Sequence, residues 1–464
     1  MFGKWGLFVL AALASAAVLT SSAGAVTQGS AGINVSTRAG VVHYLASLGV
    51  SARGVVVQRG AHNYAGPNCP GKGWTCTTAK RVLQIAKAHN DDNNFVCAGG
   101  GGFSNPPGDC EIVQFSTNGA NNVARCTERS GDASADQNCT ITQNNTTGNN
   151  SIQIQQQVDT KDGVTQAATQ YAGTRQTNGT GRNDVQINQD LKQSVKKDTD
   201  GSGTQTQDGH QQASVTQDSD SGNNTVQIDQ SLAQKADAKG GPSITQLQNT
   251  DGDVNSNVGV VQFSNTGGND AHVNQSINQD AHVGKADTAT QTQGSTRSGE
   301  NEFFLQQSDG VSHVDGDQSE HQDLHAEHVG ALTQTQYGPQ WMDPDQGSNP
   351  NDRYDLDQNS DQHASDPDTQ DNSQYAECHT TGNCTADEHI HQQGQHQDNS
   401  CSGSSCDIGN FFNTSGEGSQ QGTCSVTNND GSCTGENSPP PPPPAPEGVG
   451  CEFDCRVVGN NNGG

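Results

Sequence analysis

The stretch GNNTVQIDQSLAQ, residues 222–234, decides the fold, because closely similar lines occur elsewhere in the chain. RNDVQINQDLKQ at 182–193 and GNDAHVNQSINQ at 268–279 have the same layout. Apolar residues alternate with polar ones at Val226 and Ile228, and no apolar stripe at helical spacing follows. A period of two predicts β-strands rather than helices.

The repeated line has the pattern Asn-x-apolar-x-x-x-Gln. Five copies of it occur: Asn150/Ile152/Gln156, Asn183/Val185/Gln189, Asn224/Val226/Gln230, Asn269/Ala271/Gln275 and Asn301/Phe303/Gln307. A Thr-Gln-rich element lies between these lines, at 204–207, 244–248, 290–293 and 333–336. The two elements alternate in a unit of roughly 40 residues that holds about two strand–turn segments, which predicts a solenoid or array.

Each strand alone would bury too little apolar surface to be stable. Stacked copies would bury a thin aliphatic core and align their amides in ladders along the stack. The expected ladder residues are Asn150, Gln156, Asn183, Gln189, Asn224, Gln230, Asn269, Gln275, Asn301 and Gln307. The predicted fold is therefore an all-β, β-solenoid-like stack with a disulfide-clipped N-terminal region and a largely irregular or disordered C-terminal third.

The composition limits the size of the core and the kind of partner. Of 464 residues, 29% are hydrophobic and 4% aromatic, against roughly 45–50% apolar in typical globular domains. The balance of 22 basic and 51 acidic residues gives a net charge of −29. A polyanion does not neutralise phosphates, so no nucleic-acid binding is expected. A disordered, hydrated anionic spacer stays open as an alternative to the stack.

The N-terminus predicts export. Lys4 precedes an apolar stretch at 7–19, and Ala23-Gly24-Ala25 matches a signal-peptide cleavage site. The mature chain is expected to begin at about Val26. The apolar stretch is too short to span a bilayer comfortably. We therefore expect a secreted, extracellular or cell-surface protein without a membrane span.

Fourteen cysteines agree with an oxidising compartment. In chain order they form close neighbours: Cys69/Cys76, Cys97/Cys110, Cys126/Cys139, Cys378/Cys384, Cys401/Cys406, Cys424/Cys433 and Cys451/Cys455. Local disulfides between these neighbours are the simplest connectivity. None of the pairs is C-x-x-C, which disfavours zinc ribbons and thioredoxin-type chemistry.

The expected organisation follows the composition along the chain. It comprises a signal peptide (1–25), a cysteine-containing N-terminal β region (26–140), a Gln/Asn/Thr-rich β repeat array (141–340), an Asp/His/Cys-rich irregular region (341–437), a polyproline spacer (438–448) and a cysteine-closed tail (449–464). Proline in an unbroken run favours the extended polyproline II helix.

The Asn-x-apolar-x-x-x-Gln line resembles the curlin repeat, Asn-x-Ala-x-x-x-Gln. Asn269, Ala271 and Gln275 match that pattern outright, and the resemblance covers about residues 150–310. It implies a secreted protein with Gln and Asn ladders on a β-solenoid-like stack, of the kind that assembles into extracellular amyloid fibres. The function implied is that of a structural, surface or matrix protein, with self-association into fibres or surface layers.

Two groups of histidines are candidate metal ligands. EHQDLHAEH (320–328) places His321, His325 and His328 at helical spacing beside Glu327, and DEHIHQQGQH (387–396) contains three more: His389, His391 and His396. Imidazoles near carboxylates suit Zn²⁺ or Cu²⁺. No H-E-x-x-H occurs, which excludes a metalloprotease of that type. Solvated histidines in a polar tract are the favoured interpretation.

Asp-x-Asp pairs recur next to turn signals: Asp198/Asp200, Asp218/Asp220, Asp251/Asp253, Asp315/Asp317, Asp355/Asp357 and Asp366/Asp368. Turn formation is the favoured role, and Ca²⁺ at these turns is the alternative. The nucleophile-elbow, Walker A and dinucleotide-binding motifs do not occur, so we expect neither an enzyme nor a cofactor.

A second function stays open beside the structural one. The lines with Thr204/Thr206, Thr290/Thr292 and Thr333/Thr335 resemble the outward threonine ladders of ice-binding solenoids. That resemblance implies a binding protein for ice or a polysaccharide surface.

Overall fold

The structure is a computed structural model that describes residues 35–457 with interruptions. The interruptions are 87–90, 100–109, 118, 162–163, 198–200, 250–255, 295–300, 309, 338–339, 347–352, 365–368, 372–373, 377–382, 394–395, 404–405, 412–418, 427–432 and 437–450. The expected signal peptide and polyproline spacer lie outside the described residues. The chain divides into two compact units, Met1–Val56 and Val57–Gly464.

The first unit contains the helix α2 (Arg38–Ser47). Thr37 caps its N-terminus, since the Thr37 side chain accepts a hydrogen bond of 3.1 Å from the Gly40 amide. Beyond the helix, Gly49 has a φ of 76°, a conformation that favours glycine where a helix ends. Among the described residues, no helix is long and apolar enough to cross a membrane.

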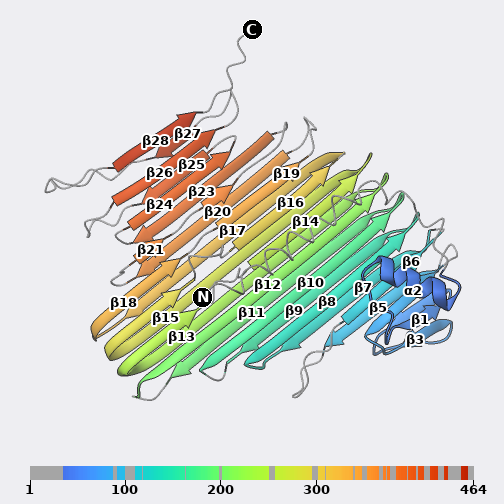
Figure 1. Cartoon of the computed structure of the whole chain (residues 1–464), viewed down its shortest axis with the longest axis horizontal. Coiled ribbons are helices and arrows are strands. Elements are labelled where there is room, and N and C mark those ends of the chain that lie inside the picture. The colour runs from blue at the N-terminus through green and yellow to red at the C-terminus, as the bar shows by residue number, and fades with distance from the viewer. Residues whose placement is uncertain are drawn as a thin grey trace, which may run out of the picture. The chain divides into compact units, whose positions relative to one another are not determined.

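The second unit is a parallel β-solenoid, which confirms the predicted all-β stack (Figure 1). The chain alternates between two series of strands, and the strands of each series pair in parallel from rung to rung. Series one comprises β2 (His62–Ala65), β3 (Trp74–Thr77), β5 (Asp92–Gly99), β7 (Asn121–Ser130), β9 (Asn150–Thr160), β11 (Asn183–Lys197), β13 (Asn224–Gln248), β15 (Gly268–Gln293), β17 (Val311–Ala326), β20 (Arg353–Ala364), β23 (Asn383–Gln393), β25 (Cys406–Phe411) and β27 (Cys433–Glu436).

Series two lies opposite series one. It comprises β1 (Val56–Arg59), β4 (Arg81–Ala86), β6 (Cys110–Ser116), β8 (Ser134–Asn145), β10 (Thr165–Asn178), β12 (Gly203–Ser219), β14 (Ser256–Ser264), β16 (Asn301–Ser308), β18 (Val329–Tyr337), β19 (Gln340–Gln346), β21 (Thr369–Asp371) and β22 (Gln374–Ala376). The long strands β13 and β15 bend, so that their C-terminal parts pair within series two. A separate sheet contains β24 (His396–Gly403), β26 (Ser419–Val426) and β28 (Cys451–Val457).

The register confirms the predicted repeat. Val185 pairs with Val226 and Ile187 with Ile228, while Val226 pairs in turn with Ala271. Equivalent asparagines of successive rungs are separated by 33, 41 and 45 residues along the chain. The predicted unit therefore corresponds to one full rung, with one strand in each series.

The interior alternates aliphatic columns with amide columns. Val185, Ile187, Val226 and Ile228 are fully buried in one continuous apolar cluster. Asparagine and glutamine columns run beside that cluster and are equally buried. The thin aliphatic core expected from the composition is confirmed, and amides fill the rest of the interior.

The amide ladders are continuous hydrogen-bonded columns. In series one, each asparagine donates from Nδ2 to Oδ1 of the next at 2.8–2.9 Å, along Asn63, Asn93, Asn122, Asn150, Asn183, Asn224 and Asn269. The same Nδ2 groups also donate to backbone carbonyls of series two, as Asn150 does to Thr177 at 3.0 Å. The donors of these amides are thereby satisfied along the stack and across it. Oδ1 of Asn63, at the start of the column, has no hydrogen-bond partner within the described residues.

Glutamines form parallel ladders. In series one, Gln189, Gln230, Gln275, Gln318 and Gln358 each donate to the preceding glutamine, and the column begins where Gln156 donates to Glu128. In series two, an uninterrupted column contains Gln58, Gln84, Gln114, Gln143, Gln176, Gln217, Gln262 and Gln307. The predicted ladder is thus longer than the sequence repeat that suggested it.

One predicted line belongs to the other series. Asn301 pairs in register with Ser256 and Gln340, within series two. Gln307 accordingly donates to Gln262, not to a member of the Gln275 column. The expectation that Asn301 and Gln307 extend the same ladder as Asn269 and Gln275 is wrong, because strands of both series use the same inward spacing of polar and apolar residues.

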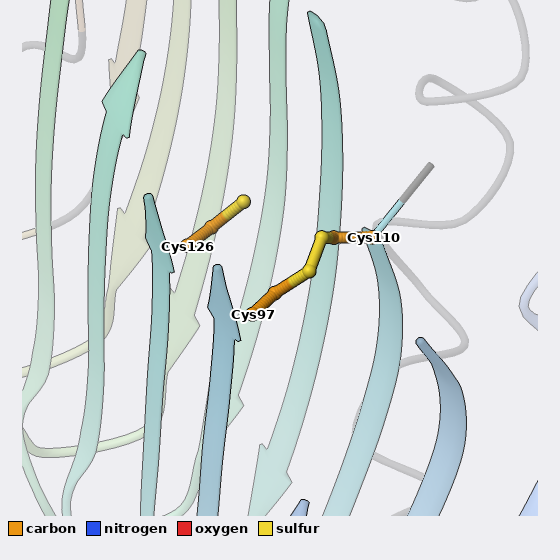
Figure 2. A group of neighbouring side chains, drawn as sticks. All are labelled: Cys97, Cys110 and Cys126. Carbon is orange, nitrogen blue, oxygen red and sulfur yellow. A yellow bond between two sulfur atoms is a disulfide. The ribbon is translucent and has the colours of Figure 1, made fainter. Parts of the chain in front are cut away.

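The cysteine-containing region from residue 57 to 140 is continuous with the repeat array, since the same amide ladders run through both. The predicted disulfides Cys69–Cys76, Cys97–Cys110 and Cys126–Cys139 are present. Cys97 and Cys126 stack in series one, while Cys110 and Cys139 stack in series two. Two disulfides therefore cross the interior in successive rungs; Figure 2 shows the first of them beside Cys126.

The C-terminal third departs from the expectation of irregular structure. Strands recur there from β19 to β28 among the described residues, with parallel pairing throughout. Gln and Asp, which are abundant in the C-terminal third, are suited both to outward positions of strands and to loops. Composition alone therefore does not distinguish strands from loops there.

The predicted disulfide of Cys384 is not confirmed. Cys384 lies in β23, and the register places it beside Tyr354 of β20 rather than beside a cysteine. Its predicted partner, Cys378, lies outside the described residues. The Cys378–Cys384 disulfide therefore stays a prediction.

The next two predicted disulfides join cysteines that the structure places in different sheets. Cys401 stacks on Cys424 in the separate sheet. Cys406 stacks on Cys433 in the solenoid. Each predicted bond would therefore cross from one sheet to the other, just as Cys97–Cys110 and Cys126–Cys139 cross from one series to the other, and both stay predictions because the side chains of these four residues lie outside the described set.

The predicted Cys451–Cys455 disulfide does not fit the tail. Both cysteines lie in β28. Residues four apart in a strand are separated by about 13 Å, whereas disulfide-bonded Cα atoms lie within about 7 Å. Register instead places Cys455 beside Cys424.

Candidate functional site

The outward side of series one carries histidines and carboxylates over β13, β15, β17 and β20. Alternation along these strands directs Val, Ile, Leu and Gln inward and, with the exception of Glu320, the ionisable residues outward. We call this surface the His/Asp face. The members described here are Asp237, Asp270, His272, His282, His313, Asp315, His321, Asp323, His325, Asp361 and His363, all half-buried or exposed.

The histidines expected at helical spacing lie on a strand. His321 and His325 belong to β17, and His328 lies in the turn after it with a φ of 43°. Four residues of strand separate His321 from His325 by about 13 Å, so the two side chains do not converge on one ion. The helical arrangement of this group is therefore wrong.

The second predicted group is described by its backbone alone. His389 and His391 lie in β23, where they pair with Asn359 and Asp361 of β20. His396 begins β24 and pairs with Ser419 in the separate sheet. These three residues therefore do not occupy one strand.

Histidines on the face pair with carboxylates of the neighbouring rung. The Nδ1 atoms of His272, His282, His313, His321 and His363 lie 3.2–3.4 Å from carboxylate oxygens of Asp315, Asp237, Asp270, Asp361 and Asp323, respectively. Partners lie about 40 residues apart in sequence, as His321 and Asp361 do. Parallel stacking therefore creates these pairs.

Two places on the face bring three ligand groups together. Asp270, His272 and His313 form one, and His282, His325 and Glu327 form the other, with the ligand atoms of each within 4.8 Å of one another. Sequence reasoning missed His272, His282 and His313. The signal available was the repeated Asp-Ala-His-Val at 270–273 and 280–283, which places two outward histidines on one strand.

The Asp-x-Asp pairs do not all mark turns. Asp315 and Asp317 lie in β17 and stack on Asp355 and Asp357 of β20. Partial loss of solvation raises the pKa of Asp317, and the neighbouring carboxylates of Asp357 and Asp315 raise it further. Asp218 and Asp220 do lie at the end of β12. Asp198/Asp200, Asp251/Asp253 and Asp366/Asp368 fall at least partly outside the described residues.

The Thr-Gln lines form a second regular surface, on series two. Thr204, Thr245, Thr290 and Thr333 stack in one column, and Thr206, Leu247, Thr292 and Thr335 in the next. Both columns point outward and are half-buried or exposed, while the glutamines between them form the inner ladder Gln205–Gln246–Gln291–Gln334. We call this surface the threonine face.

No protein-family model, curated protein or solved structure matches the chain.

Proposed function

We propose that the protein is a secreted structural protein of a cell surface or extracellular matrix, in which a rigid stack of β rungs supports flat outer faces. The observation that carries the proposal is the pair of uninterrupted amide ladders from Asn63 to Asn269 and from Gln58 to Gln307. Such ladders fix each rung to the next along most of the chain. The crossing disulfides support an oxidising destination.

We propose further that the stack ends within one chain. The first strands, β1 and β3, have four residues each, and the Cys69–Cys76 disulfide clips the segment before β3. Short, constrained edge strands oppose addition of another chain. The asparagine column also ends in other residue types, since Asn63 pairs with Thr75 and Asn269 with Ser312.

Electron microscopy of the oxidised chain after quiescent incubation tests this proposal. We expect discrete particles whose circular dichroism shows β-sheet. Unbranched fibres would overturn the self-terminated stack and support the curlin-like mode of assembly instead. A chain with the circular dichroism of a coil would overturn the structural role altogether, and replacing Ile187, Val226 and Ile228 with Asp provides that unfolded reference.

The threonine face supports a second candidate function, binding to an ordered hydroxyl-rich surface such as ice or a polysaccharide. Its columns repeat at about 4.8 Å between strands and about 6.7 Å along them. Thermal hysteresis with ice-crystal shaping is the test for ice, and Thr290→Lys with Thr333→Lys should abolish it. The matched control is Asn274→Lys, an exposed position on the opposite series. Absence of hysteresis in the wild type would remove ice as the ligand.

A further inference from the structure

The two three-ligand clusters on the His/Asp face share one construction. In the first, Asp270 Oδ1 lies 3.3 Å from both His272 Nε2 and His313 Nδ1. The two imidazole rings are nearly perpendicular, with centroids 5.8 Å apart. Asp270 Oδ1 is shielded from solvent and makes no hydrogen bond of normal geometry within the described chain. Three donor atoms thus converge on one point.

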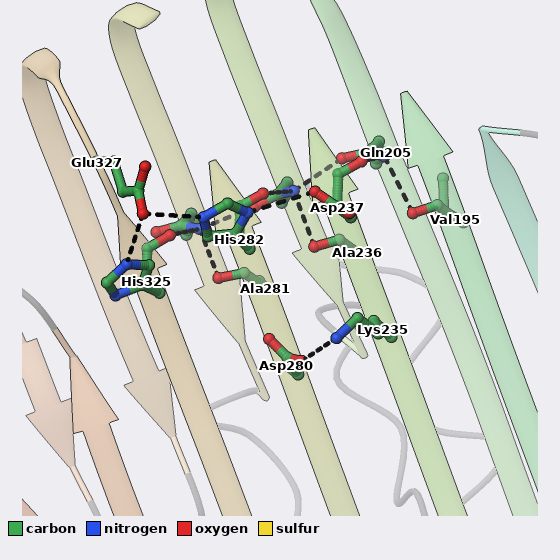
Figure 3. A network of polar contacts seen from close by, with 12 residues as sticks. Val195, Gln205, Lys235, Ala236, Asp237, Asp280, Ala281, His282, His325 and Glu327 are labelled. Carbon is green, nitrogen blue, oxygen red and sulfur yellow. Dashed lines mark hydrogen bonds and ion pairs between the residues drawn. The ribbon is translucent and has the colours of Figure 1, made fainter. Parts of the chain in front are cut away.

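The second cluster lies about ten residues further along β15. Glu327 Oε1 lies 4.0 Å from His282 Nε2 and 3.7 Å from His325 Nε2 (Figure 3). The two rings are stacked, with centroids 5.3 Å apart and planes 10° apart. About 33 Å of strand separates His272 from His282, so the two clusters are independent of each other.

In both clusters a carboxylate on the adjacent rung orients the central histidine. Asp315 Oδ2 lies 3.4 Å from His272 Nδ1, and Asp237 Oδ1 lies 3.3 Å from His282 Nδ1. Donation from Nδ1–H to these carboxylates leaves each Nε2 with its lone pair directed at the cluster. Histidines that ligate metals are held in this way by an outer carboxylate.

The other histidines on the face provide an internal contrast. His321 and His363 each pair with one carboxylate, Asp361 and Asp323. Neither belongs to a group of three ligand atoms within the described residues. The two clusters therefore differ from the other His–Asp pairs of neighbouring rungs in having a third ligand group.

The donor set selects the class of ion. Two imidazoles and one carboxylate suit a borderline divalent transition ion, whereas Ca²⁺ and Mg²⁺ require oxygen ligands. Tetrahedral Zn²⁺ with ligands at about 2.1 Å holds them roughly 3.4 Å apart. The 3.3 Å separations of the first cluster match this value, and the second needs a small closure of the exposed Glu327 side chain.

We propose that Asp270/His272/His313 and His282/His325/Glu327 are two Zn²⁺ sites on the outer side of series one, with Asp315 and Asp237 as positioning residues. Each site joins neighbouring rungs, so bound zinc ties β15 to β17 from outside the core. A water molecule completes each coordination shell. This inference is independent of the structural role and of fibre formation.

Equilibrium dialysis of the full oxidised chain against Zn²⁺ at neutral pH, followed by elemental analysis, tests the proposal. We expect two bound zinc ions per chain that excess Ca²⁺ does not displace. His272→Gln and His282→Gln should each remove one ion, and the matched control His321→Gln should retain both. All three side chains are on the surface, so circular dichroism should be unchanged.

The positioning residues have their own readout. Asp315→Asn should weaken the first site by about 10–100-fold and leave the second unchanged, while Asp361→Asn, beside His321, should affect neither. Visible absorption of the Co²⁺-substituted protein should show tetrahedral bands that fall by half in His272→Gln. A wild type that binds no zinc would overturn the proposal. Equal losses in His321→Gln and His272→Gln, or full binding in both cluster variants, would overturn it equally.

Discussion

Gly222 stacks against Gly181 so closely that a Cβ on Gly222 would collide with the carbonyl oxygen of Gly181. The same close approach occurs in five successive turns from series two to series one, in the column Gly148, Gly181, Gly222, Gly267 and Gly310, whereas Ala120 holds the equivalent position in the turn before them. In every case the glycine precedes by two residues the first inward residue of the next strand. From Gly148 onward, the carbonyl of the preceding rung occupies the space that a Cβ at this position would need. Stacking of these five turns at the spacing of the strands therefore requires glycine here.

Replacing Gly222 with Ala should destabilise the solenoid by more than about 2 kcal/mol, because the obstacle is backbone and cannot move aside. Urea unfolding followed by circular dichroism measures the change. Gly259→Ala is the matched control, since a Cβ there meets nothing within 4 Å. The control should be neutral or slightly stabilising. Equal stability of the two variants would contradict the stacked turn.

Removing one amide from a ladder should cost more than removing one from the surface. Gln176 donates to Gln143 at 2.8 Å and to the Asp184 carbonyl at 3.0 Å, and it accepts from Gln217. Gln176→Leu leaves these buried partners without a hydrogen bond, which should lower the free energy of unfolding by about 1–3 kcal/mol for each partner. Gln153, which is exposed, serves as the control. If Gln153→Leu lowers the free energy of unfolding as much as Gln176→Leu does, the ladder does not carry the stability assigned to it.

The inward pattern of the fold was predictable from sequence. Each strand must direct alternate residues to the same interior, so residues like Val226, Ile228 and Gln230 recur at the equivalent positions of the neighbouring strands β11 and β15. The glycine column was available from the same comparison, because Gly181 and Gly222 stand at equivalent places before Asn183 and Asn224. Positions with such strict geometric requirements can therefore be recognised from the sequence repeat.

The outward pairings were not predictable, because they depend on the length of each rung. His272 meets Asp315 across 43 residues, whereas Asn183 meets Asn224 across 41. A shift of one residue would turn every outward side chain inward. Helical spacing drew attention to His321 and His328, while the residues that converge lie on separate strands. The sequence also did not show that Asn301 belongs to series two, because the strands of both series have the same inward pattern.

Breaking one crossing disulfide should open the stack locally. The Cys97–Cys110 bond links residues 13 apart in sequence, in β5 and β6. A disulfide that closes a loop of that size stabilises the folded chain by about 3 kcal/mol. Since each rung of a solenoid contacts mainly its neighbours, Cys97→Ala with Cys110→Ala should reduce amide-exchange protection in β5 and β6. Protection in β13 and β15 should be retained. Uniform loss of protection along the whole chain would show that the stack unfolds as one unit.

Glu320 should make stability fall with rising pH. Its side chain is 3% exposed, occupies the inward column of Leu232 and Ile277, and makes no hydrogen bond from either carboxylate oxygen within the described residues. Burial raises the pKa of Glu320 well above its usual range. The folded chain therefore keeps a proton that the unfolded chain releases above about pH 4.3, and the free energy of unfolding decreases as pH rises through the folded pKa.

Urea unfolding between about pH 4 and pH 8 measures this dependence. Glu320→Gln removes the titrating group, so its advantage over the wild type should be smallest at the acid end and grow as pH rises. Glu320→Leu, which matches Leu232 in the column, should be more stable than the wild type across the range. The control Asp287→Asn changes an exposed carboxylate, and its profile should parallel that of the wild type. A Glu320→Gln profile that also runs parallel to the wild type would mean that Glu320 ionises alike in the folded and unfolded chains, contrary to its burial.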